Sequence, residues 1–176
     1  MIHHISIAVN NPQHVADVIA ELWQGRAVPF PGHEGSYIAF RFDLYGTAIE
    51  VMPKSLILKP GLETAAVRFA DCEPATGYTA THANIEVAVS EERVWEIAER
   101  EGWRAVRCRR GGVIDLIELW VENQVMLELL PPNLMPEYLA AVEPKSLSAL
   151  LNDLAAEPGN NTPEVVSDRP TIFGNF

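Results

Sequence analysis

Two stretches of the chain alternate between apolar and polar residues in the manner of half-buried β-strands. Within residues 81–89 the apolar positions fall on one side, and His82 falls on the other. Residues 4–9 repeat this arrangement, with His4 on the polar side. Successive side chains of a strand point to opposite faces of the sheet. Each stretch therefore predicts a strand with one core face and one polar face that carries a histidine.

The two histidines are 78 residues apart, and the same offset relates other parts of the chain. Glu50 and Glu128 are also 78 residues apart, so each histidine precedes its glutamate by 46 residues. Matching segments are 19–21 with 97–99, 26–28 with 104–106, and 48–53 with 126–131. Agreement at several separated places indicates a repeated supersecondary unit.

The hydrophobic pattern of residues 1–53 predicts one βαβββ module. Asn11 is a favoured N-cap and Pro12 suits the first helical position, and an apolar stripe follows at helical spacing. The predicted elements are a strand over 2–9, a helix over 11–24, and strands over 27–30, 37–44 and 47–52. The last of these strands carries Glu50.

Residues 81–131 predict a second βαβββ module. Ser90 caps a helix whose first turn is acidic, and Gly102 follows its end. The predicted elements are a strand over 81–89, a helix over 91–101, and strands over 103–108, 113–121 and 124–130. A hairpin turn at Glu122-Asn123 joins the last two strands, and the final strand carries Glu128.

The rest of the chain predicts connecting and terminal segments. Residues 54–80 are rich in proline and glycine, and we interpret them as a linker with a short strand or turn near 64–69. Residues 132–176 predict one or two C-terminal helices, broken near Pro144, and a loosely ordered tail from Glu157. The expected fold class is α+β, with two βαβββ modules and a C-terminal helical extension.

Composition limits the classes of partner. The formal net charge is −11, which argues against a general nucleic-acid or anionic-membrane surface. No apolar stretch is long enough to cross a membrane, and no signal-peptide pattern is present. Two cysteines without CxxC spacing favour free thiols in a reducing compartment, so we expect a cytoplasmic protein. One local basic run is interpreted as a solvated strand and turn, with contact to an anionic substrate group as the alternative: Arg104, Arg107, Arg109 and Arg110.

His4, Glu50, His82 and Glu128 form the candidate site. Each is the polar member of an alternating strand, and a carboxylate among apolar neighbours is costly to bury unless it is paired or binds a cation. Two imidazoles and two carboxylates suit a divalent metal such as Zn²⁺, Ni²⁺, Mn²⁺ or Fe²⁺. Each residue alone is more often an ordinary strand residue, and the shared offset is what favours a metal site. The remaining histidines do not repeat and receive no role: His3, His14 and His33.

The openings 3–9 and 81–87 and the closings 46–50 and 126–129 resemble the vicinal oxygen chelate superfamily, over residues 2–131. The resemblance implies that paired βαβββ modules form a U-shaped mixed sheet around a central cleft that holds a metal. Glu50 in the fourth ligand position is similar to glyoxalase I or methylmalonyl-CoA epimerase. This implies a lyase or isomerase that acts on a small α-oxo or 2-acyl compound through a metal-stabilised enediolate.

Roles carried over by position make Glu128 the base, with Glu50 as its symmetry-related alternative. Tyr37 and Arg41 are expected to share a strand face that lines the cleft and contacts a substrate carboxylate or phosphate. Two other functions stay open. One is a metal-free module that sequesters a small molecule, as bleomycin-resistance proteins do, and the other is a metal-dependent dioxygenase. We expect a homodimer, because the apolar C-terminal helices need a surface to cover. The sequence leaves open whether modules pair within one chain or between two.

Overall fold

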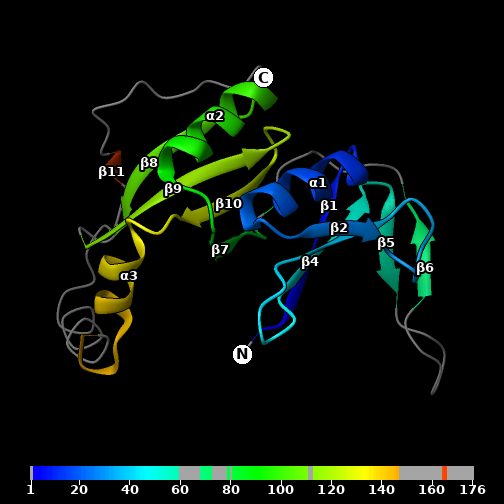
Figure 1. Ribbon diagram of the computed structural model, residues 1–176. Helices are drawn as coiled ribbons and strands as arrows, with labels where there is room; N and C mark the ends of the chain where they lie inside the picture. The colour runs from blue at the N-terminus through cyan, green and yellow to red at the C-terminus, as the bar shows by residue number, and fades with distance from the viewer. Residues whose placement is uncertain are drawn as a thin grey trace. The chain divides into compact units, whose positions relative to one another are not determined.

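A computed structural model describes residues 2–59, 68–72, 79, 81–110, 113–146 and 164–165. The chain divides into two compact units, Met1–Thr81 and His82–Phe176 (Figure 1). Each unit is described by itself. No helix within the described ranges is both long enough and apolar enough to cross a membrane.

The first unit contains a βαβββ module built on a four-stranded sheet, drawn in blue to teal in Figure 1. Its elements are β1 (His4–Val9), α1 (Pro12–Trp23), β2 (Arg26–Pro29), β3 (Tyr37–Phe40) and β4 (Ala48–Pro53). The strand order is β1-β4-β3-β2. β1 pairs with β4 in parallel, and the other neighbours are antiparallel. The predicted module is confirmed.

Local sequence signals fix the position of α1 and its neighbouring strands. The Asn11 side chain accepts a hydrogen bond from the backbone N of His14 at 3.3 Å, and Pro12 opens the helix. Gln24 ends the helix in the left-handed conformation, at φ 52°. Gly25 then passes the carbonyl oxygen of Phe40 so closely that a Cβ would lie 1.9 Å from it, so this crossing requires glycine.

The core of the first unit lies between α1 and one face of the sheet. Ile49 and Val51 of β4 are buried, and their partners across β1 are Ile5 and Ile7. The buried stripe of α1 covers this face: Val15, Ala16, Val18, Ile19, Ala20, Leu22 and Trp23. The opposite face is therefore the one that carries Glu50.

Residues 54–80 hold more regular structure than the predicted linker. β5 (Leu56–Lys59) and β6 (Arg68–Asp71) pair antiparallel as a two-stranded sheet. The predicted short strand near 64–69 overlaps β6 in part, and residues 60–67 lie outside the described residues.

The second unit repeats the module. Its elements are β7 (Ala83–Glu86), α2 (Glu91–Glu101), β8 (Ala105–Arg110), β9 (Ile114–Val121) and β10 (Val125–Leu130), followed by α3 (Met135–Val142) and β11 (Glu164–Val165). The sheet order is β11-β8-β9-β10-β7, with β10 parallel to β7. Without the edge strand β11, this is the order of the first unit. The prediction of two βαβββ modules in an α+β fold is confirmed.

The second module also follows its local signals. The Ser90 side chain accepts a hydrogen bond from the backbone N of Arg93 at 3.3 Å, and Gly102 ends α2 at φ 65°. Glu122 and Asn123 adopt φ 49° and 57°, which suits the two-residue turn between right-twisted strands. The predicted hairpin is therefore correct, although it contains no glycine.

The predicted strand over 37–44 is too long, because β3 ends at Phe40. The Asp43 carboxylate accepts hydrogen bonds from the backbone N of Tyr45 at 2.9 Å and of Thr47 at 3.1 Å. These bonds and the one from the Thr47 hydroxyl lower the pKa of Asp43 to about 2. Such local bonds compete with the strand ladder and close a turn. Phe42 has φ 60° and is exposed rather than in the core.

Two further predictions have different outcomes at their boundaries. The strand predicted over 81–89 is only β7, so His82 lies immediately before the strand and not within it. α3 confirms the first C-terminal helix. The second predicted helix lies largely outside the described residues, as does the tail apart from β11.

Candidate metal-binding pairs and the charged face of the second module

Glu50 and His4 come together on the sheet face opposite α1. Ser6 lies across from Glu50 in the β1–β4 pairing, and its hydroxyl donates to Glu50 Oε2 at 2.7 Å. His4 Nε2 lies 3.8 Å from Glu50 Oε1. The Glu50 side chain is only 14% exposed, whereas that of His4 is 57% exposed. The first predicted histidine–glutamate pair is therefore adjacent in space.

Glu128 has the equivalent surroundings in the second module. Asn84 lies across from Glu128 in the β7–β10 pairing, and its amide donates to Glu128 Oε2 at 3.4 Å. Ser6 and Asn84 are themselves 78 residues apart, so the sequence offset corresponds to the same strand register in both modules. His82 is two residues from Asn84 and is exposed.

The His4–Glu50 pair fits a divalent cation. Two ligand atoms at ordinary metal distances of about 2.1 Å are separated by about 3.0 Å in octahedral geometry and about 3.4 Å in tetrahedral geometry. The observed 3.8 Å therefore needs a closure of only about half an ångström at a half-exposed histidine. No group of three His, Cys, Asp or Glu side chains suited to a metal forms among the described residues. Each pair belongs to its own unit, and their union in one four-residue site stays a prediction.

Glu128 differs from Glu50 in having an arginine partner. Arg110 Nε donates to Glu128 Oε1 at 3.1 Å, and Arg110 Nη2 donates to Glu118 Oε1 at 2.6 Å. Glu118 Oε2 accepts from Arg104 Nη1 at 3.3 Å and from Trp120 Nε1 at 3.2 Å. Arg104, Glu118, Arg110 and Glu128 thus form a row of alternating charges, which we call the charged row.

The electrostatics of the charged row follow from these bonds. Burial opposes ionisation of Glu118, but the hydrogen bonds from Arg110 and Trp120 outweigh it and lower the pKa of this carboxyl. Sequence reasoning missed the row. The strand alternation was visible in the sequence, but the pairing of β8 with β9 was not, and this register is what brings Arg110 to Glu118.

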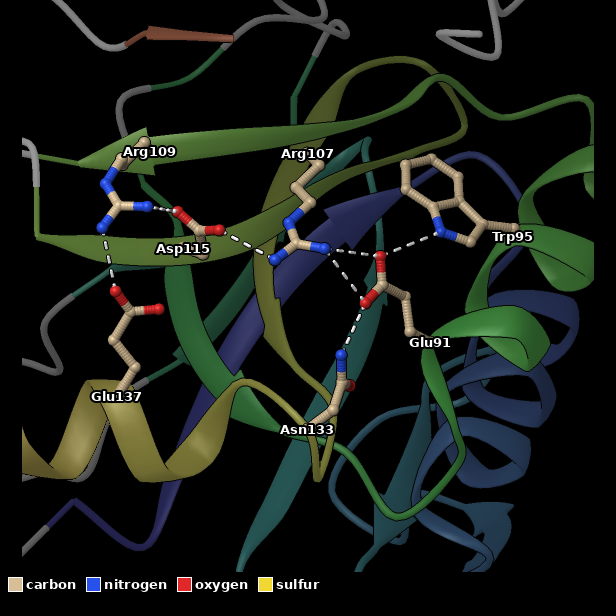
Figure 2. A network of polar contacts seen from close by, with 7 residues as sticks. All are labelled: Glu91, Trp95, Arg107, Arg109, Asp115, Asn133 and Glu137. Atoms are coloured by element: carbon tan, nitrogen blue, oxygen red, sulfur yellow. Dashed lines mark hydrogen bonds and ion pairs between the residues drawn. The ribbon is translucent and has the colours of Figure 1, made fainter. Parts of the chain in front are cut away.

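The other two arginines of the basic run lie on the helix side of the same sheet (Figure 2). Arg107 Nη2 donates to Asp115 Oδ2 at 2.8 Å, and Arg107 Nη1 lies 3.3 Å from Glu91 Oε1 at the start of α2. Arg109 joins Asp115 at 3.0 Å to Glu137 of α3 at 3.0 Å. Burial acts against the charge of Arg107, but these carboxylates outweigh it and raise its pKa. The expectation of a solvated basic run is wrong, since all four arginines are ion-paired.

The expected substrate contacts need correction as well. Tyr37 lies across from Val51, and its hydroxyl donates to Gln13 of α1 at 3.1 Å. It therefore faces the helix, whereas Ile38 is the β3 residue that shares a face with Glu50. Arg41 lies beyond the end of β3, where its backbone N donates to Thr47 O at 3.0 Å. The two residues do not share a strand face with the glutamate.

The remaining histidines and cysteines have structural surroundings. His3 Nδ1 lies 2.6 Å from Tyr45 O, and His33 Nδ1 lies 3.2 Å from Ser36 Oγ. Cys72 and Cys108 are free thiols. Burial, with the nearby Glu118 charge, raises the pKa of Cys108 to about 11, so this thiol is not an activated nucleophile.

Each module has the βαβββ topology of the vicinal oxygen chelate superfamily. No family model and no curated protein sequence matches the chain. Among solved structures, it is similar to the fosfomycin resistance protein FosX from Listeria monocytogenes, with 12% identity, a TM-score of 0.46, and coverage of 78% of this chain and 97% of that chain. It is also similar to VPC_CASS1, from the mobile metagenome of V. Pseudocholerae (13% identity, TM-score 0.46, 75% and 94% coverage).

A third similar structure is the oxidase ChaP-H2, with 12% identity, a TM-score of 0.42, and coverage of 74% of this chain and 92% of that chain. These likenesses are distant in sequence. We therefore argue the function of this chain from its own residues.

Proposed function

We propose that the chain is a divalent-metal enzyme of the lyase or isomerase type, which acts on a small α-oxo or 2-acyl compound. His4, Glu50, His82 and Glu128 are the proposed metal ligands. The observation that carries the proposal is the repeated strand register, which sets Glu50 beside Ser6 and Glu128 beside Asn84. The His4–Glu50 pair adds two donor atoms at a separation close to that of two ligands of one cation.

The residues divide the chemistry as follows. A divalent cation, when bound, supplies Lewis acidity that eases removal of a proton next to a carbonyl group. Glu50 is the preferred base, in contrast to the choice of Glu128 made from the sequence. The Ser6 hydroxyl holds one Glu50 oxygen, and the other is directed to His4. Glu128 donates its charge to an ion pair with Arg110, which makes it the poorer proton acceptor and leaves it a positioning and ligand role.

The deciding experiment is metal content by mass spectrometry on protein purified without an affinity tag. The wild type is expected to hold about one divalent transition metal per chain, or to take one up after incubation with Mn²⁺, Ni²⁺ or Zn²⁺. His4→Ala and Glu50→Gln should abolish the uptake. His14→Ala is the matched control, since it removes an exposed histidine outside the proposed set and should leave uptake unchanged. A wild type that takes up none of these metals would overturn the proposal.

A metal-free binding module is the second candidate, and one observation favours it. Glu128 already has a cationic partner in Arg110 and a donor in Asn84, so its charge is compensated without a metal. This function predicts no stoichiometric metal and a ligand affinity that survives His4→Ala. Fe²⁺-dependent oxygen uptake would point instead to the third function, a dioxygenase. The homodimer stays a prediction, which sedimentation of the full chain can test.

A further inference from the structure

Arg110 is shared between two carboxylates whose needs are unequal. Glu118 receives Arg110 Nη2 at 2.6 Å, and it also receives Arg104 and Trp120. Glu128 receives Arg110 Nε at 3.1 Å and, more distantly, Asn84 at 3.4 Å. Glu118 therefore keeps Arg110 in place by the shorter bond, and the contact with Glu128 is the one that can be exchanged.

The guanidinium also has unused donor capacity. Arg110 Nη1 is buried and lacks a hydrogen-bond partner among the described residues. An unsatisfied buried donor costs about 1–3 kcal/mol, and more when it is charged. If Glu128 turned to another cation, Nε would join Nη1 as a free donor while Nη2 stayed on Glu118. A planar oxyanion with two acceptor oxygens would satisfy both.

We propose that Arg110 and a divalent cation compete for Glu128, and that a cation bound to Glu128 releases Arg110 to bind a carboxylate of the substrate. The inference rests on the proposed function and narrows its substrate class to an α-oxo carboxylate. The cation and the substrate anion then bind cooperatively. Because such coupling is reciprocal, the anion tightens the cation by the same factor as the cation tightens the anion.

The test compares Arg110→Met with Arg104→Met. Both changes remove one positive charge that is paired with Glu118, and only Arg110 contacts Glu128. Titration calorimetry with Mn²⁺ alone should show about tenfold tighter binding in Arg110→Met, because the internal competitor is gone. Arg104→Met should change the affinity less than about threefold, since it alters the local field but leaves Glu128 paired.

A second titration addresses the anion, with pyruvate as the charged probe and pyruvamide as its neutral counterpart. In the wild type and in Arg104→Met, saturating Mn²⁺ should tighten pyruvate by about tenfold and pyruvamide much less. In Arg110→Met the advantage of pyruvate should be lost. Should Arg110→Met fail to fold, as far-UV circular dichroism would reveal, Arg110→Lys takes its place. Lysine keeps the charge without the planar fork, and it should also weaken the coupling.

The outcomes separate this inference from the proposed function. Mn²⁺ binding that is unchanged in Arg110→Met, or tightened equally in both variants, overturns the competition and leaves the metal site intact. Binding of Mn²⁺ by Arg110→Met alone supports the competition directly. Absence of binding in the wild type and in both variants overturns the metal site and the competition together.

Discussion

Replacement of Arg107 by methionine should destabilise the second unit by about 2–3 kcal/mol. Arg107 lies between Asp115, which is 5% exposed, and Glu91, which is 9% exposed. Loss of one partner from a buried ion pair typically costs about 3–5 kcal/mol. The expected value lies below this range, because the Arg107 side chain is 30% exposed and each carboxylate keeps another donor, Arg109 for Asp115 and Asn133 for Glu91.

The matched control is Arg93→Met. The Arg93–Glu96 pair is shorter, at 2.6 Å, than either ion pair of Arg107, but its side chains are 45% and 63% exposed. Exposed pairs of this kind contribute about 0.2–1 kcal/mol. Urea unfolding followed by tryptophan fluorescence measures both variants, since three of the four tryptophans belong to the second unit: Trp95, Trp103 and Trp120.

Two results would refute this reasoning. A cost below about 1 kcal/mol for Arg107→Met would mean that the carboxylates find full compensation from their other donors or from water. Equal costs for Arg107→Met and Arg93→Met would mean that burial is not what determines the contribution. In the double variant Arg107→Met/Glu91→Gln the cost should be less than the sum of the single changes, because one uncompensated carboxylate has been removed.

Three further predictions concern single positions. With its pKa at about 11, Cys108 should resist Ellman's reagent in native protein at pH 8 while Cys72 reacts. Since an ordinary thiol ionises near 9.0, stability should fall as the pH rises from 9.0 to about 11, and Cys108→Ala should flatten this slope in urea titrations. Gly25→Ala should lower the melting temperature, because its Cβ meets Phe40 O. Asp43 should stay ionised in nuclear magnetic resonance titrations until the pH falls through about 2, where its stabilisation is lost.

The sequence predicted the modules well because their signals are local and occur twice. The caps at Asn11 and Ser90 bound helices that the structure places within about a residue of expectation. The strand ends were less certain, since hydrophobic alternation continues beyond the point where pairing stops. Phe42 continues the apolar alternation of β3, yet the side-chain bonds of Asp43 turn the backbone there.

The site was predictable only in its repeated part. The offset of 78 residues marked Glu50 and Glu128, and the parallel strand register gives both the same neighbour position. The partners of Glu128 could not be predicted, because Arg110 reaches it across two strand pairings. Four arginines in seven positions look like one patch in the sequence. Strand alternation divides them between two faces, each with its own carboxylates.

The point at which the repeat fails is informative about function. At the repeat offset, Arg110 corresponds to Gly32, and Ile38 takes the place across from Glu50 that Glu118 takes across from Glu128. The first module thus keeps the glutamate and the neighbouring donor but has no arginine–glutamate pair at these positions. A purely structural repeat would give both glutamates the same partners. Under the proposed function the difference assigns separate tasks, since Glu50 remains available for proton transfer and the pairing of Glu128 with Arg110 links metal binding to the substrate anion.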